Sequence, residues 1–464
     1  MMKLKNLSIL VLLTIIYYSC GSHKHVKDKN VSNVVLHINM NNYNGNKAFI
    51  QGTDKKVYEI KKIDNGKFVD TLQIPEGYYK LNLGREFTNV YLTPGDNLNI
   101  SLDAEKFDET MHYEGKGAEE NNYLAKKLLL TEKLTSKKNM LALYGLDEAG
   151  FLKKQKSINE QYKQLLAQSQ IKNKNFLDAE NKAIKIKNAI TLLQYPDYKR
   201  YLSKNNNFKV SKSYPDTSKD IDVNDEKLLK IPGFIDYATI FVQKEIIKNI
   251  SKPDDAKPIN RLKKLNSLIT NKKIRENLAF NMGMADIEYV SNIDDYVNLY
   301  KTMVTNPTFL KPLEQKAENL KKVHPGADSP DFKAFDINGK EYHLKDFAGK
   351  LLYIDLWATW CAPCRAEIPY LEKLKKEYNG KNINFLSIDV YDQKAKWEQM
   401  MKTGKLTGNQ LISTDRNMNF LKVYSVNGIP RFILLDENGK IISQNAMRPS
   451  NPQLKQLINQ HLNK

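Results

Sequence analysis

A chain of 464 residues is too long for one hydrophobic core, so two to four domains are expected. Hydrophobic residues make up 41% and aromatic residues 10%, which excludes a wholly disordered chain. The net charge of +19 is spread evenly, with 20 Lys and Arg against 15 Asp and Glu from residue 323 onward and 52 against 38 before it. No basic arm stands out, so nucleic-acid binding is not indicated. The three cysteines are too few for a disulfide-stapled scaffold or a four-cysteine zinc site.

The N-terminus reads as an export signal. Two lysines precede an apolar run, Leu7 to Tyr18, that is too short to span a bilayer comfortably but suits a signal peptide. Ser19 and Cys20 close the run and resemble the bacterial lipoprotein signal, although that signal usually has Leu where Tyr17 stands. The resemblance implies a signal over residues 1–19, lipidation of Cys20 and a polar tether over 20–32. A plain secretory signal or an uncleaved anchor is the alternative. Each of these signals would export the chain.

Residues 33–115 read as β-rich. Runs such as Val34–Ile38 and Tyr79–Leu83 are strand-like, and turn signals such as Asn65-Gly66 separate them. The alternation of strand-like runs and turns predicts a small antiparallel sandwich. It also resembles a β-rich domain of unknown function in Bacteroidetes lipoproteins, with the turn Leu92–Asp96 as the nearest match.

Residues 119–322 change to a helical pattern. Apolar residues recur at spacings of three and four in the runs Tyr123–Leu134, Phe176–Leu193 and Phe234–Ile250. Prolines, Pro196 among them, follow these runs at positions where we expect the helices to break. This region carries no recognisable catalytic motif, and we interpret it as a helical spacer or partner-binding domain.

The chemistry is concentrated at Cys361 and Cys364. An apolar strand candidate, Leu351–Trp357, runs into these cysteines, and a helical pattern follows them. The junction places Cys361 at a helix N-terminus, where free backbone N–H groups and the helix dipole stabilise a thiolate. Pro363 stiffens the turn between the cysteines. Cys361 can then attack a disulfide, and Cys364 can resolve the mixed disulfide that forms.

Two other uses of a C-x-x-C motif are disfavoured. A zinc site needs two more ligands, and only the scattered His324, His343 and His461 are at hand. Haem attachment needs His after the second cysteine, where Arg365 stands. We therefore predict no metal and no cofactor beyond the redox-active disulfide.

The residues around the cysteines resemble the thioredoxin superfamily. The match rests on Trp360-Cys-Ala-Pro-Cys364 with Asp355 before it and Pro369 after it, and on the segment Val426–Lys440. Three further features are similar to the TlpA/ResA branch, namely Glu367, Ala327–Phe332 and Leu344–Lys350. The resemblance covers residues 323–464 and implies an α/β thioredoxin fold there.

The resemblance also implies a role for individual residues. Cys361 is the nucleophile, Cys364 is the resolving thiol, and Asp355 is a buried acid that handles the proton of Cys364. A carboxylate buried near thiols would have a raised pKa, whereas a half-exposed Asp at a strand end would not. Glu367 matches a glutamate that tunes the thiols, although an acid in a first helical turn also simply stabilises a helix.

Four supporting positions complete the predicted site. Pro430 is expected to be the cis-proline that faces the cysteines, and the Ile429 backbone is expected to offer strand-like contacts to substrate. Trp357 and Trp360 either cover the disulfide or serve as structural aromatics.

We expect an exported, membrane-anchored thiol-disulfide oxidoreductase that works as a reductase. Ala-Pro between the cysteines lacks the histidine of strongly oxidising relatives. A reductase outside the cytoplasm needs an integral-membrane thiol donor. We expect its substrates to be exported proteins with disulfides. The family resemblance suggests apocytochrome c as one of them. We expect a periplasm-facing location, with inner or outer membrane left open. The alternative is a binding lipoprotein with an accessory redox module, and peroxide reduction is disfavoured because the Thr-x-x-Cys setting is absent.

Overall fold

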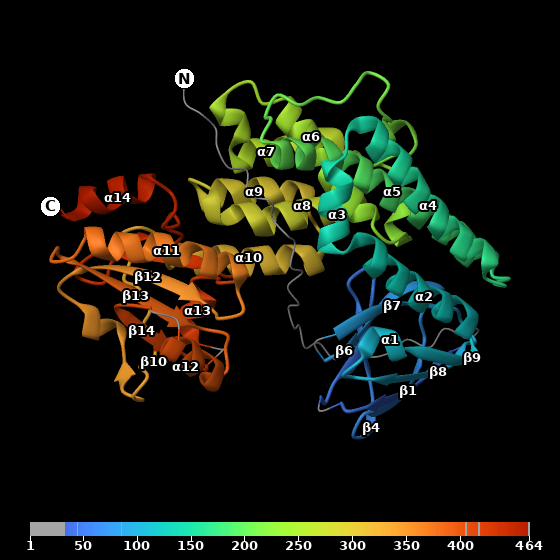
Figure 1. Ribbon diagram of the computed structural model, residues 1–464, viewed down its shortest axis with the longest axis horizontal. Coiled ribbons are helices and arrows are strands. Elements are labelled where there is room, and N and C mark those ends of the chain that lie inside the picture. The colour runs from blue at the N-terminus through green and yellow to red at the C-terminus, as the bar shows by residue number, and fades with distance from the viewer. Residues whose placement is uncertain (1–32, 44, 85, 404–405, 416–417, 463–464) are drawn as a thin grey trace. The chain divides into compact units, whose positions relative to one another are not determined.

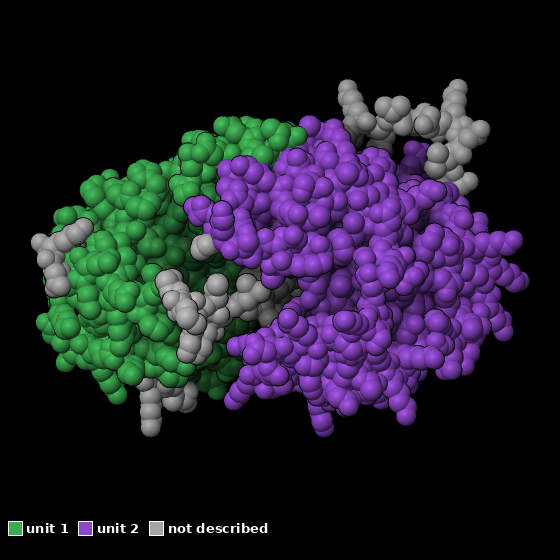
Figure 2. All heavy atoms as spheres, turned by 90° about the horizontal axis from the view of Figure 1, so that it is seen from above, with its two compact units in different colours: residues 1–21, 283–302, 309–464 green, residues 22–282, 303–308 purple. Residues whose placement is uncertain are grey.

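A computed structural model describes residues 33–462 except 44, 85, 404–405 and 416–417, so the predicted signal, Cys20 and the tether lie outside the described residues. The chain forms two compact units, coloured separately in Figure 2. In chain order, the first unit, purple in Figure 2, has its described residues within 33–282 and 303–308, and the second unit, green in Figure 2, has them within 283–302 and 309–462. Among the described helices, none is both long and apolar enough to cross a membrane.

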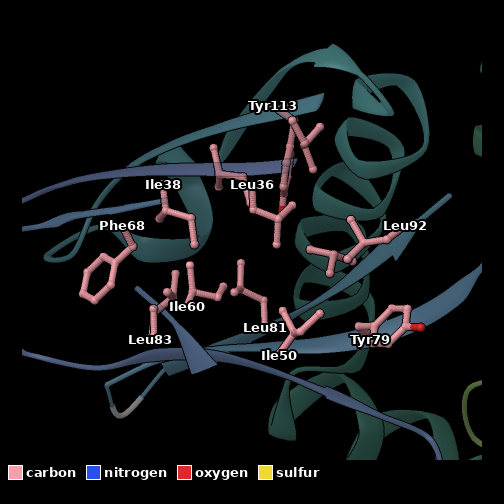
Figure 3. Close-up of a cluster of buried hydrophobic side chains, with 14 of the residues drawn as sticks. Leu36, Ile38, Ile50, Ile60, Phe68, Tyr79, Leu81, Leu83, Leu92 and Tyr113 are labelled. Atoms are coloured by element: carbon pink, nitrogen blue, oxygen red, sulfur yellow. The ribbon is translucent and has the colours of Figure 1, made fainter. Parts of the chain in front are cut away.

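The first unit begins with a two-sheet β-sandwich, and one core between the sheets holds it together. One sheet has the order β4-β5-β1-β8-β9 and the other the order β3-β2-β6-β7. Leu36 and Ile38 of one sheet face Ile50 and Leu81 of the other, each no more than 1% exposed (Figure 3). The strands are β1 Val34–Asn41, β2 Ala48–Gly52, β3 Val57–Ile60, β4 Lys62–Asp64, β5 Lys67–Leu72, β6 Gly77–Leu83, β7 Glu86–Leu92, β8 Asn97–Asp103 and β9 His112–Lys116.

The strand pairing in this sandwich departs from the prediction at one place. All its strand pairs are antiparallel except β1 with β8, which run parallel. Every other residue of β1 is buried, which is the pattern of a strand with one face on a core. The predicted sandwich is therefore present but is not purely antiparallel.

Helices make up the rest of the first unit (Figure 1). They are α1 Phe107–Thr110, α2 Ala118–Thr135, α3 Lys137–Gly145, α4 Glu148–Gln168, α5 Lys174–Ser203, α6 Phe234–Lys248, α7 Pro258–Leu268 and most of α8 Lys272–Asp286. Short 3-10 helices are η1 Thr217–Lys219, η2 Glu226–Lys230 and η3 Pro253–Ala256.

Helix α5 continues through Pro196, where the sequence predicted a break. Proline cannot donate a hydrogen bond to the carbonyl four residues before it, which here belongs to Leu192. The hydroxyl of Tyr214 donates to that carbonyl instead, at 2.8 Å. A side chain from the following loop thus replaces the missing helical donor.

The second unit is built on a seven-stranded sheet of order β11-β10-β14-β13-β12-β15-β16. Strand β12 lies inside the sheet, where it runs parallel to β13 and antiparallel to β15. The strands are β10 Ala334–Phe335, β11 Glu341–Tyr342, β12 Leu351–Trp357, β13 Ile383–Asp389, β14 Asn409–Ile412, β15 Arg431–Leu435 and β16 Ile441–Ser443. The helices are η4 Ile287–Tyr289, α9 Ile293–Met303, α10 Pro307–Lys321, η5 Leu344–Phe347, α11 Ala362–Glu377, α12 Lys394–Thr403, α13 Asn419–Val423 and α14 Gln453–Leu462.

Helical residues before the sheet belong to this second unit. The sequence suggested that a helical region ends at residue 322 and that a redox domain begins at 323. The compact unit instead takes in residues 283–302 and 309–321. One face of α10 is buried through Phe309, Leu313 and Leu320. The last part of the helical region is therefore packed as part of the redox-bearing unit.

Candidate active site at Cys361 and Cys364

The two cysteines lie at the junction between β12 and α11. Cys361 is the N-cap of α11, and the backbone N–H of Cys364 donates to its Sγ at 3.2 Å. The two sulfurs form a disulfide, with the Cα atoms 5.3 Å apart. Both cysteines are 3% exposed. The predicted placement of Cys361 at a helix N-terminus is confirmed, and in the reduced protein this position stabilises a thiolate.

The segment before β15 lies against the sulfur of Cys361. The Ile429–Pro430 peptide bond is cis, as the sequence predicted. The Sγ atom of Cys361 lies 3.7 Å from the backbone oxygen of Ile429. Arg431 follows directly and pairs with Leu356 of β12, so the same two strands carry the cysteine junction and the proline.

Asp355 is a buried acid in the middle of the sheet. It is 7% exposed, and every residue of β12 is buried. Burial, helped by the charge of Glu367, raises the pKa of Asp355 to about 7, although the charge of Lys375 and a hydrogen bond from Ser387 act in the opposite direction. The buried-acid prediction is confirmed over the half-exposed alternative. Its pKa lies between that of an ordinary carboxylate and that of a thiol.

Glu367 is also buried, and its carboxylate binds Ser450. It is 8% exposed and accepts hydrogen bonds from the backbone N–H and the hydroxyl of Ser450, both at 2.9 Å. The interpretation of Glu367 as a first-turn acid is wrong, because the first turn of α11 has no acidic residue. Its carboxylate joins α11 to the segment before α14, and its charge acts on Asp355.

The two tryptophans near the cysteines differ in exposure. Trp357 is 2% exposed, whereas Trp360 is 60% exposed. Pro363 occupies one of the first two positions of α11 and is exposed. Trp357 lies in the same buried hydrophobic cluster as both cysteines, and Trp360 is the aromatic that a bound substrate could reach.

A second pair of acids, which the sequence reasoning missed, lies beside the cysteine loop. Asp389 ends β13 opposite Trp357 and is fully buried. Burial, followed by the hydrogen bond and the charge of Asp392, raises the pKa of Asp389 to about 8. Asp392 in turn accepts a hydrogen bond from the backbone N–H of Thr359 at 2.6 Å. The available signal was two acids at the end of an apolar strand, since parallel strands bring their carboxyl ends to one sheet edge.

Comparisons with known proteins agree with this geometry. The family model described as Redoxin matches residues 324–458. The thiol-disulfide oxidoreductase ResA of Geobacillus thermodenitrificans is 34% identical over 119 residues, which cover 26% of this chain and 67% of that protein. ResA of Bacillus thuringiensis subsp. konkukian is 29% identical over 137 residues, which cover 30% of this chain and 78% of that protein.

A solved structure gives a further comparison. The crystal structure of a Bacteroides vulgatus protein assigned as a thiol-disulfide oxidoreductase is 40% identical, with a TM-score of 0.29. That comparison covers 30% of this chain and 98% of the other. The residues that match the Redoxin family model, 324–458, contain both the strand-to-helix cysteine junction and the proline segment. The chain thus belongs to the ResA-like thiol-disulfide oxidoreductases, with a thioredoxin-fold redoxin domain at its C-terminal end.

Proposed function

We propose that this protein is an exported, membrane-anchored reductase that transfers electrons from Cys361 and Cys364 to disulfides of other exported proteins. The observation that carries the proposal is the disulfide itself, with Cys361 at the N-terminus of α11 and its Sγ 3.7 Å from the Ile429 oxygen. A substrate strand that pairs with the Ile429 backbone would bring its own disulfide to Cys361.

The proposed reaction has two thiol–disulfide exchange steps. The Cys361 thiolate attacks one substrate sulfur, a mixed disulfide forms, and the departing substrate thiolate takes up a proton. Cys364 then loses its proton and attacks the Cys361 sulfur, which restores the internal disulfide and releases the second substrate sulfur as a thiolate that takes up a proton from water. We propose Asp355 as the acceptor of the Cys364 proton, because a buried carboxyl with a pKa of about 7 can both accept and return a proton near neutral pH.

The electron supply and the anchor complete the proposal. The internal disulfide must be reduced again by two electrons, and outside the cytoplasm we assign this step to an integral-membrane thiol donor. Lipidated Cys20 would hold the protein at the periplasmic side of a membrane. Apocytochrome c and other exported proteins with oxidised cysteine pairs are the substrates that the ResA resemblance suggests.

Reduction of insulin tests the catalytic part. The pre-reduced full-length protein should reduce about one insulin disulfide per molecule. The Cys361→Ser variant serves as the control and should reduce none. If the reduced wild-type protein leaves insulin disulfides intact and binds a partner equally well in both redox states, the protein is instead a binding lipoprotein with an accessory redox module.

Membrane fractionation tests the anchor separately. In the producing bacterium, the wild-type protein should sediment with membranes, and the Cys20→Ser variant should not become lipidated and should leave the lipoprotein fraction. Retention of the variant at wild-type levels would contradict a lipid anchor.

A further inference from the structure

A buried charge cluster lies directly behind the proline segment of the redox site. Arg431, the first residue of β15, follows Pro430 and has a side chain that is 8% exposed. Its Nη2 donates to the Tyr424 oxygen at 3.1 Å, and its Nε donates to the Gln444 oxygen at 3.3 Å. Its third partner is the carboxylate of Glu288, which accepts from Nη1.

Glu288 comes from the helical segment, not from the thioredoxin-like domain. It lies in η4 between α8 and α9, outside the residues that match the redoxin family. Its carboxylate is 10% exposed and also contacts the Nζ of Lys316 on α10 at 2.6 Å. Lys316 is 4% exposed and donates to the Met284 oxygen at 2.7 Å. One carboxylate therefore neutralises part of the charge of two buried cations.

The electrostatics of this cluster make Glu288 hard to replace. Burial alone would raise the pKa of Glu288, but the charges of Arg431 and Lys316 outweigh it, and the pKa is lowered. Glu288 is therefore ionised at neutral pH. A buried charge that loses its partner is strongly unfavourable, so without Glu288 the guanidinium of Arg431 would be driven to find another position.

A second contact ties the same segment to the same part of the domain. Helix α10 lies next to α13 (Figure 1), and Asn319 Nδ2 donates to the Lys422 oxygen at 3.3 Å. Tyr424, which accepts from Arg431, follows α13 directly. The helical segment thus supports Arg431 both through Glu288 and through the end of α13.

We propose that Glu288 is a positioning residue of the redox site, which acts through Arg431 to hold residues 429–431 against Cys361. Residues 283–321 are then a working part of the oxidoreductase and not a spacer. The inference rests on the proposed attack by Cys361 on a protein disulfide whose strand docks at Ile429. Small disulfides need no such strand, so their reaction with Cys361 depends on α11 and not on Glu288.

The experiment compares two oxidants of the pre-reduced full-length protein, insulin and 5,5′-dithiobis(2-nitrobenzoate). Glu288→Gln alone would remove the carboxylate that Arg431 and Lys316 share. The double variant Glu288→Gln/Lys316→Met keeps the summed charge of Glu288, Lys316 and Arg431 at +1, as in the wild type, and is therefore the variant to use. Lys316→Met, which keeps the Glu288–Arg431 pair, and Glu314→Gln, which removes the 2.8 Å pair with Lys301, are matched controls.

We expect the double variant to react with insulin at least about tenfold more slowly while its rate with the small disulfide stays unchanged. Both controls should keep the wild-type rates. The positioning role is overturned if the insulin rate and the small-disulfide rate of the double variant keep their wild-type ratio, whether both rates are unchanged or both fall equally.

Hydrogen exchange gives a readout that does not depend on insulin as a substrate. In the double variant, the peptide that spans residues 424–435 should exchange faster than in either control. Unchanged exchange would overturn the inference even if wild-type protein failed to reduce insulin. That failure alone would count against the proposed function.

Discussion

Asp355→Asn should make the redox domain more stable than the wild type, by an amount that grows between about pH 4 and pH 7 and is constant above this range. The folded protein raises the pKa of Asp355 from 3.8 to about 7. The folded state therefore holds this proton more tightly than the unfolded state does, and ionisation of Asp355 weakens folding as pH rises between these values. Asparagine has no proton to lose, so the variant lacks this part of the pH dependence.

The magnitude follows from the shift. A shift of one pKa unit corresponds to about 1.4 kcal/mol, so the full effect is about 4 kcal/mol at high pH. At pH 5 the unfolded side chain is already mostly ionised, and about 1.7 kcal/mol of the effect is present. The variant should therefore gain roughly 2–3 kcal/mol of unfolding free energy relative to the wild type between pH 5 and pH 8.

Tryptophan fluorescence isolates the domain in question, because all three tryptophans, at positions 357, 360 and 397, lie in the second unit. Urea unfolding of the oxidised protein at the two pH values gives the free energies. Asp328→Asn, at a carboxylate whose side chain is 85% exposed, is the control. A difference between wild type and Asp355→Asn that does not change with pH, or that changes in the opposite direction, would refute the reasoning.

Three further changes test other parts of the account. Glu367→Gln removes a negative charge that raises the pKa of Asp355, so the titration midpoint of Asp355 should move to lower pH. NMR of the carboxyl groups measures this midpoint, and an unchanged value would contradict the coupling. Tyr214→Phe removes the hydroxyl that donates to the Leu192 carbonyl and should lower the unfolding free energy by about 1–2 kcal/mol. Denaturant unfolding followed by circular dichroism measures this, and an unchanged free energy would refute the explanation of the proline in α5. Cys364→Ser should trap substrate as a mixed disulfide on non-reducing gels, and release as fast as from wild type would exclude a resolving role.

The local features of the site could be predicted from the sequence because each depends on neighbouring residues. The strand Leu351–Trp357 is uniformly apolar apart from one acid, so the burial of Asp355 followed from its neighbours. The change to a helical pattern after the cysteines placed Cys361 at a helix N-terminus. The proline segment was recognisable from its resemblance to a family pattern.

Features that depend on distant contacts could not be predicted in this way. Arg431 and Glu288 are separated by 143 positions, and no local sequence pattern indicates that they pair. The continuation of α5 through Pro196 depends on a hydroxyl from a loop residue, Tyr214, which local helix propensity does not include. Tertiary contacts decided both outcomes.

The reduction potential of the Cys361–Cys364 pair tests the central claim most directly. Equilibration of the full-length protein with dithiothreitol buffers, followed by thiol alkylation, gives this value. The account predicts a potential near about −270 mV, which is characteristic of a reductant, and a value near about −120 mV, which is characteristic of a strong oxidant, would contradict it.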